Sequence, residues 1–242
     1  MSGTASPWVY PTECTLIPGC VPEGVQTVYE DADLLVLNKP SGLLCVPGRG
    51  ADKQDCLSAR AQARWPGALV VHRLDQATSG LVLMARHAAA QRVLSLAFEQ
   101  RQVHKRYQAV VHGCLNDSGN DGGVASDLEW HTIDLPIAAD WDRRPLRIID
   151  AVLGKSSITH WRGLAYDATT HTTRIELEPV TGRTHQLRVH MAAIGHAMVG
   201  DGLYADAAVR ALAPRLLLHA SHLAFSHPAT GQRLALESTA CF

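Results

Sequence analysis

Short apolar segments separated by turn residues dominate the chain from Val28 onward, and this pattern constrains the fold more than any other feature. Residues 28–42 contain a short strand, an acidic turn and a second apolar strand. Residues 156–180 and 222–238 each have the pattern of a hairpin. Because turns join these strands more often than helices do, the sequence predicts an α+β fold with a largely antiparallel sheet.

Three segments have helical patterns. Residues 57–67, LSARAQARWPG, predict a short helix that ends at the Pro-Gly pair. Residues 87–102 predict a second helix with one apolar face, formed by Val93, Leu94, Ala97 and Phe98. A third helix is expected over 184–194, with Arg183 at its entry and Gly195 as a left-handed stop.

The composition indicates a globular protein with a substantial core. Of its 242 residues 46% are hydrophobic, which is enough for one sizeable domain or two small ones. There are 22 basic and 23 acidic residues, so binding to nucleic acid would require a local basic face. The sequence has no export signal and no membrane-spanning run, which predicts a cytoplasmic protein with no membrane partner. The cysteines are expected to be free thiols: Cys14, Cys20, Cys45, Cys56, Cys114 and Cys241.

The expected organisation is an N-terminal arm followed by one catalytic domain. Residues 1–27 begin with a stretch rich in Pro, Gly and Thr and predict an extended arm, and residues 28–242 form the domain. Asn, Asp, Ser and Gly are dense in 115–127, which predicts an excursion loop.

The loop at 70–80, VVHRLDQATSG, contains the most suggestive polar residues. It lies between the apolar runs 69–71 and 81–85, and loops held by rigid strands often carry chemistry. Asp75 is a turn cap, a local partner of Arg73, or a reagent. A carboxylate fixed beside a guanidinium stays ionised and aimed when it leaves bulk water, so the third role is chemically sound.

Two other kinds of site have little support in the sequence. His72 lies close to Asp75, but no G-x-S-x-G nucleophile elbow is present, so a Ser-His-Asp hydrolase is disfavoured. His185 and His190 are five residues apart rather than the four of a helical metal pair, and there is no H-E-x-x-H motif. No metal site is therefore predicted.

Positive charges near the third helix and near Tyr107 leave two interpretations open. Arg183 and Arg188 bind a phosphate or a catalytic carboxylate, or they are ordinary solvated charges. The segment at 105–107, Lys-Arg-Tyr, suits an extruded base but also suits any strand edge.

Taken in order, four segments resemble the motif series of the RluA-type pseudouridine synthases. They are LLVLNKPSGLLCVPGRG, HRLDQATSG, KRYQAVVHG and TGRTHQLRVHMAAIGHAMVGDGLYA. The resemblance runs from about Val28 to the C-terminus. It implies the pseudouridine synthase fold, with a mixed and mainly antiparallel sheet, flanking helices and a central active-site cleft.

The resemblance also implies a role for each matching residue. Asp75 is the essential catalytic carboxylate, and Arg73 enters the RNA to occupy the space of the extruded uridine. Tyr107 stacks on that base, and Arg183 pairs with Asp75. The implied reaction breaks the C1′–N1 bond of uridine and rejoins the base through C5, with no cofactor and no metal. Asp75 adds to C6, attacks C1′ or removes a ribose proton, and the sequence does not choose among these paths.

The implied partner is RNA. LLCVPGRG, DLPIAADWDRRP and APRLLLHASHL match a subgroup that acts on 23S rRNA and on the anticodon stem-loop of certain tRNAs, without an S4 RNA-binding domain. The alternatives are another tRNA or rRNA uridine, or a non-catalytic RNA-binding module. No protein partner is implied, and a monomer is expected. The expected contributors to a basic RNA face are Arg49, Lys53, Arg60, Arg64, Arg143, Arg144 and Arg147.

Overall fold

The computed structural model describes residues 26–115 and 129–242. The predictions for 1–25 and 116–128 therefore lie outside the described residues; they concern nearly all of the N-terminal arm, with Cys14 and Cys20, and most of the excursion loop. The chain divides into two compact units. The first comprises the residues up to Lys105 together with Ala220–Cys241, and the second comprises Arg106–His219 with Phe242.

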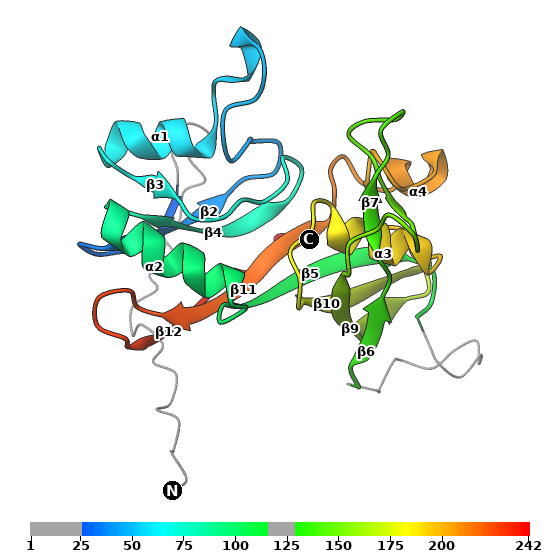
Figure 1. The fold of residues 1–242 in the computed structure, drawn as a ribbon. Helices are drawn as coiled ribbons and strands as arrows, with labels where there is room; N and C mark the ends of the chain where they lie inside the picture. Colours follow the sequence, from blue (N-terminus) through cyan, green and yellow to red (C-terminus); the bar gives the residue numbers. More distant parts are fainter. Residues whose placement is uncertain (1–25, 116–128) are drawn as a thin grey trace, which may run out of the picture. The chain divides into compact units, whose positions relative to one another are not determined.

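The first unit is built on strands in the order β1-β2-β4-β11, with β3 paired to β4 and β12 paired to β11 (Figure 1). The strands are β1 (Gln26–Glu30), β2 (Leu34–Lys39), β3 (Leu69–Val70), β4 (Ser79–Ala85), β11 (Leu218–Ser226) and β12 (Arg233–Glu237). Strand β2 is antiparallel to both β1 and β4, and its pairing with β1 agrees with the strand–turn–strand pattern predicted for residues 28–42. Its hydrophobic residues are fully buried, because both faces of this part of the sheet are covered.

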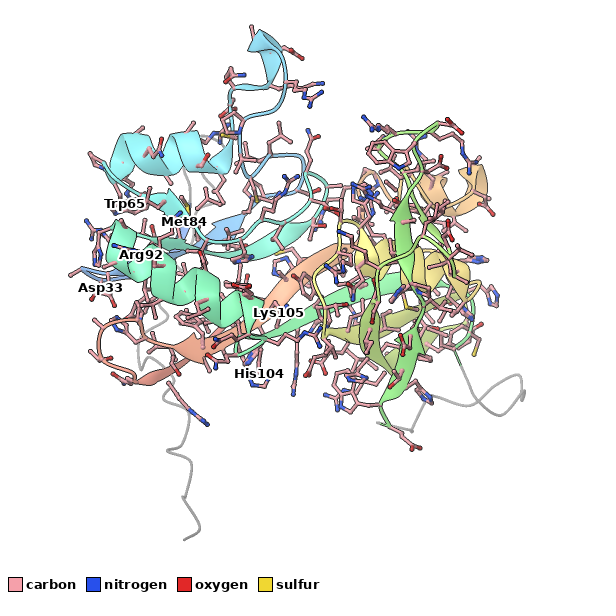
Figure 2. All side chains as sticks on the ribbon, in the orientation of Figure 1. Asp33, Trp65, Met84, Arg92, His104 and Lys105 are labelled. Carbon is pink, nitrogen blue, oxygen red and sulfur yellow. The ribbon has the colours of Figure 1, made fainter. Side chains whose placement is uncertain are left out.

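Helices cover the sheet of the first unit. They are α1 (Leu57–Arg64) and α2 (Ala88–Glu99), whereas the short 3-10 helix η1 (Ala51–Lys53) is exposed and buries no residue. Helix α2 packs against β3 and β4 and buries Ala90 and Leu94 in the core. The predicted apolar face was wrong at Val93, which is 48% exposed because it lies about 100° around the helix from Leu94. At the end of α1, Trp65 (Figure 2) donates from Nε1 to Glu30 Oε1 at 2.8 Å.

The second unit has a sheet with the strand order β5-β10-β9-β6 and a separate hairpin, β7-β8. The strands are β5 (His104–His112), β6 (His131–Asp134), β7 (Ile137–Ala139), β8 (Arg147–Ile149), β9 (Ile158–Asp167) and β10 (Thr172–Pro179). All the strand pairs within this unit are antiparallel. Two helices accompany them, α3 (Gln186–Ala193) and α4 (Ala207–Ala211).

The predicted α+β class and both predicted hairpins are confirmed, as β9-β10 and β11-β12. The third helix begins two residues later than predicted, because His185 adopts the left-handed conformation with φ 59° and so precedes the first helical turn. Gly195 ends the helix as expected, with φ 89°. Among the described residues, no helix is both long and apolar enough to cross a bilayer.

Candidate functional site

Asp75 lies in the loop between β3 and β4, as the sequence predicted. The loop alternates in exposure, with Arg73 exposed, Leu74 buried and Asp75 partly buried. The carbonyl of Asp75 accepts a hydrogen bond from the Thr78 amide at 3.1 Å, which closes a tight turn. Leu74 thus points into the core, while Arg73 and Asp75 on either side of it both remain accessible to solvent.

The turn after β2 anchors this loop through hydrogen bonds. Lys39 Nζ and the Gly42 amide both donate to the carbonyl of Gln76, at 3.1 and 2.8 Å. Ser41 Oγ donates to the carbonyl of Ala77 at 2.7 Å, and the Gln76 side chain returns a bond to Gly42 O at 3.0 Å. The backbone immediately after Asp75 is thus fixed at several points.

Lys39 is fully buried and is the centre of this anchor. Its ammonium also donates to the carbonyls of Pro40 and Leu43, at 2.8 Å each. Burial lowers the pKa of Lys39 to about 8, and the negative charge of Asp75 partly opposes that shift. This lysine was not singled out from the sequence. The strand alternation, which puts it on the same face as the buried Leu37, was the signal for its burial.

Cys45 supports the other side of the loop. Its Sγ accepts a hydrogen bond from the Leu74 amide at 3.2 Å. Burial raises the pKa of this thiol, while the charges of Lys39 and Arg73 act against the rise. The prediction of free thiols is confirmed for the cysteines that the structure describes, namely Cys45, Cys56, Cys114 and Cys241.

Gly80, where the loop enters β4, permits a close approach of two backbones. Its φ is 112°, and a Cβ at this position would lie 2.4 Å from the carbonyl oxygen of Ala220. A side chain is excluded both by this conformation and by the contact. Gly80, the last residue of the motif, is therefore needed to shape the loop.

His72 is partly buried and packs within the first unit. Its Nε2 accepts a hydrogen bond from the Leu83 amide at 2.9 Å, and its ring stacks on Phe98 with centroids 4.5 Å apart. Burial, with a smaller effect from the charge of Lys105, lowers the pKa of His72 to about 3. The imidazole is thus a neutral structural acceptor, which agrees with the rejection of a His-Asp relay.

Arg183 and Tyr107 lie in the second unit. Arg183 is exposed in the loop between β10 and α3, and its Nε donates to the carbonyl of Ser156 at 3.4 Å. Tyr107 is partly buried on β5, opposite Leu177 of β10. Because Asp75 and Arg73 lie in the first unit, the pairing of Asp75 with Arg183 stays a prediction.

Gln186, the first residue of α3, holds the loop that carries Arg183. Its Oε1 accepts hydrogen bonds from Thr181 Oγ1 at 2.8 Å and from the Arg183 amide at 3.0 Å. Its Nε2 donates to the carbonyl of Ile158 and to Thr159 Oγ1. This glutamine was not singled out from the sequence, since a polar residue at a helix start does not reveal such a role.

Arg188 does not have either of the roles considered for it. Its guanidinium is buried and forms a bidentate pair with Asp201, with Nε–Oδ2 at 2.8 Å and Nη2–Oδ1 at 2.6 Å. Asp201 also accepts the amides of Leu203 and Tyr204. Asp201 neutralises the charge of Arg188 inside the second unit. Arg188 is therefore neither a solvated charge nor a free anion binder.

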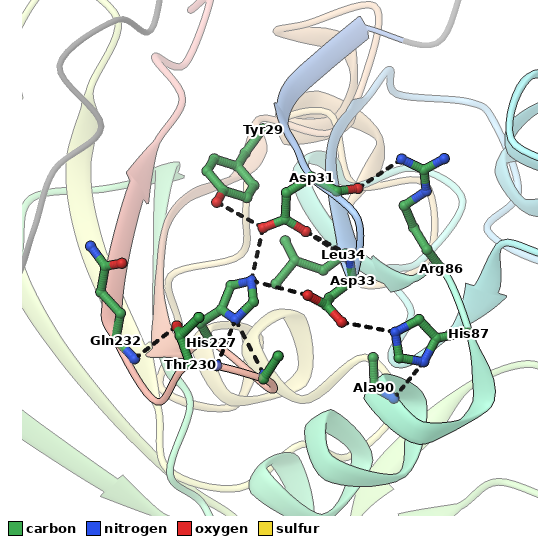
Figure 3. A network of polar contacts seen from close by, with 11 residues as sticks. Tyr29, Asp31, Asp33, Leu34, Arg86, His87, Ala90, His227, Thr230 and Gln232 are labelled. Carbon is green, nitrogen blue, oxygen red and sulfur yellow. Dashed lines mark hydrogen bonds and ion pairs between the residues drawn. The ribbon is translucent and has the colours of Figure 1, made fainter.

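One group of side chains within the described residues has the proximity of metal ligands: Asp31, Asp33 and His227, whose ligand atoms all lie within 4.8 Å (Figure 3). His227 Nδ1 accepts the amides of Ala229 and Thr230, both at 3.2 Å, and its Nε2 lies 2.8 Å from Asp31 Oδ2. The proton is therefore on Nε2, and neither ring nitrogen has a lone pair left for a cation. The group is a hydrogen-bonded link between two turns.

The basic residues predicted to contribute to an RNA-binding face differ in their contacts and in their positions along the chain. Arg60 forms a bidentate pair with Asp55, with both distances 2.7 Å. Arg64 lies over the Trp65 ring, 4.5 Å from its centroid. Arg49 and Lys53 are exposed. The remaining three, Arg143, Arg144 and Arg147, lie in or next to the turn between β7 and β8.

Comparison with known proteins gives one consistent result. The model of the family described as RNA pseudouridylate synthase matches residues 33–193. Dual-specificity RNA pseudouridine synthase RluA of Escherichia coli (strain K12) is 43% identical over 215 residues, which cover 89% of this chain and 93% of that protein. The Haemophilus influenzae protein of the same name is 40% identical over the same shares. The solved structure of Human RNA Pseudouridylate Synthase Domain Containing 1 matches with a TM-score of 0.71 and 30% identity, over 92% of this chain and 85% of that chain.

Proposed function

Because the chain belongs to the RNA pseudouridylate synthase family, as an RluA-type member that isomerises uridine in RNA, we propose that Asp75 is the carboxylate that performs this reaction. The C1′–N1 bond breaks, the uracil turns, and a C1′–C5 bond forms. The hydrogen at C5 leaves as a proton and N1 gains one, so atoms and electrons balance within the nucleotide and water. The reaction needs a placed nucleophile or base rather than a redox partner.

The anchored loop is the observation that carries this proposal. Asp75 is partly buried, and the next two residues, Gln76 and Ala77, have their carbonyls fixed by donors from the turn after β2. A carboxylate on such a loop is held in place before substrate binds, which lowers the entropic cost of reaching the transition state. Three chemical paths stay open for this side chain: addition to C6, attack at C1′, or removal of a ribose proton.

Arg73, Tyr107 and Arg183 complete the proposed machinery. A uridine in a stem or loop must leave the stack before its C1′ can be reached, and Arg73 is exposed and able to fill the space left behind. Stacking on the Tyr107 ring returns about 1–3 kcal/mol per base. Arg183 is proposed to pair with Asp75 and keep it ionised, since a nearby cation lowers the pKa of a carboxyl group.

The proposed substrates are a 23S rRNA uridine and a uridine in a tRNA anticodon loop. Relatives that are 40–43% identical bear the name dual-specificity RNA pseudouridine synthase, which supports two classes of RNA. Another tRNA or rRNA uridine is the alternative. The protein is proposed to act as a monomer in the cytoplasm.

Mapping pseudouridines in total RNA from a strain that lacks this protein tests the proposal. The expected result is the loss of one site in 23S rRNA and of one site in the anticodon loop of certain tRNAs. The wild-type chain should restore both, and Asp75→Asn should restore neither. If the assigned sites stay modified in a strain that also lacks the related enzymes, the proposal is contradicted.

A further inference from the structure

Trp141 is an exposed tryptophan at the tip of the β7-β8 hairpin. Its side chain is 71% exposed, whereas Trp65 is buried. The guanidinium of Arg144 lies 3.9 Å from the ring centroid, so it covers only part of the indole. A single exposed apolar residue is not unusual, but an indole with a guanidinium over one part of its face offers a stacking surface in positively charged surroundings.

The turn that presents Trp141 is rigid. Asp140 is buried, and its carboxylate accepts the Arg143 amide at 3.1 Å and the Arg143 Nε at 2.8 Å. The backbone of Leu146 is bonded to Arg143 at 3.0 Å and to Asp140 at 3.1 Å. The indole is therefore presented on a fixed frame. Arg143 neutralises Asp140. Among the described residues, no arginine forms an ion pair with the other carboxylate of the turn, that of Asp142.

Arg147, at the start of β8, has an unused buried donor. Its Nε is inaccessible to water and has no hydrogen-bond acceptor among residues 26–115 and 129–242. Its amide donates to Tyr204 Oη at 3.0 Å, and that hydroxyl is 2.7 Å from His185 Nδ1. A buried unpaired N–H is costly, and because this Nε is closed to solvent, an anionic oxygen could bind only at the partly exposed remainder of the Arg147 side chain.

We propose that the Trp141 turn, residues 140–147, is an RNA-binding element separate from the catalytic residues. Trp141 stacks on an unpaired base, and Arg144 and Arg147 bind the phosphates beside it. The inference rests on the proposed function, because it takes the RNA substrate as its ligand. It adds a contact that explains how a chain with a net charge of −1 holds RNA.

The chemistry of the turn favours RNA over a protein partner. An aromatic ring flanked by guanidinium groups is the arrangement that binds single-stranded bases. Trp and Arg are also enriched in protein interfaces, but the core of such an interface is more apolar than the rest of the surface. The exposed apolar residues nearest in sequence, Val152 and Leu153, follow β8 and so lie beyond the other end of the hairpin.

The test measures the affinity of full-length variants for an unmodified transcript of a tRNA anticodon stem-loop. Trp141→Ala should weaken binding about 5- to 150-fold, the range that a stacked base gives, whereas Trp141→Phe keeps a ring and should lose less. Leu153→Ala removes an exposed apolar side chain from the same unit and should leave the affinity unchanged. Arg144→Ala should lower the slope of log K against log salt by about 1, while the charge-matched Arg92→Ala on α2 should not.

The outcomes separate this inference from the proposed function. If the wild-type chain neither binds nor modifies rRNA and tRNA stem-loops, the proposed function fails. If it does both, and Trp141→Ala and Arg144→Ala bind as tightly as the wild type at unchanged melting temperature, the Trp141 turn is not an RNA contact. A wild-type dimer that Trp141→Ala dissociates, with RNA affinity unchanged, would also overturn it in favour of a protein contact.

Discussion

Replacing Lys39 with Met should change how stability depends on pH. The ammonium is fully buried against three carbonyls, and burial lowers its pKa from the ordinary 10.5 to about 8. Between these values the unfolded chain binds more protons than the folded one, so the Lys39 contribution to stability rises with pH. These two pKa values give a rise of about 2 kcal/mol in the free energy of unfolding between pH 7 and pH 9.5.

The assay is urea denaturation of the wild type and of Lys39→Met at several pH values across that range. Other groups titrate there too, so the informative quantity is the difference between the two free energies of unfolding. That difference should shift by about 2 kcal/mol in favour of the wild type as the pH rises. The exposed Lys53→Met is the control and should show no such shift. If the wild type and Lys39→Met change in parallel, the ammonium is not buried as described.

Three further predictions concern the frame of the site. The pKa of His72 is about 3 in the fold, so below pH 6.5 the unfolded chain binds the extra proton and stability falls by about 1.4 kcal/mol per pH unit; His72→Phe should remove this part of the acid slope in denaturant titrations. Arg188→Met strands the buried Asp201 and should cost about 3–5 kcal/mol by urea denaturation, whereas a cost under 1 kcal/mol would mean that the pair is solvated. Gly80→Ala places a methyl group 2.4 Å from Ala220 O and should cost more than about 3 kcal/mol; an unchanged melting temperature would refute that contact.

Strand and turn patterns could be predicted where the local signal agrees with the packing. Alternating residues and tight turns located β9-β10 and β11-β12, and the apolar run at 34–37 located β2. The short hairpin β7-β8 was missed, because three-residue strands have too little periodicity to detect. The late start of α3 depends on the left-handed His185, which no periodic pattern reveals.

The chemical site could be predicted in part, through the motif that contains Asp75. The residues that fix the Asp75 loop could not be predicted, because they come from segments distant in the sequence. Lys39 reaches the carbonyl of Gln76 across 37 positions, and Cys45 accepts the Leu74 amide across 29. Arg188 gave a misleading signal for a related reason, since its partner Asp201 lies beyond the end of the helix and was not considered.

The most direct test of the account is single-turnover pseudouridine formation by purified Asp75→Asn on rRNA and tRNA stem-loops. Asn keeps the size and shape of the side chain and one acceptor oxygen, but not its charge or nucleophilicity. Pseudouridine formation should fall below detection, while the melting temperature and the affinity for both RNAs stay close to those of the wild type. Turnover at a rate near that of the wild type would show that Asp75 is not the catalytic carboxylate.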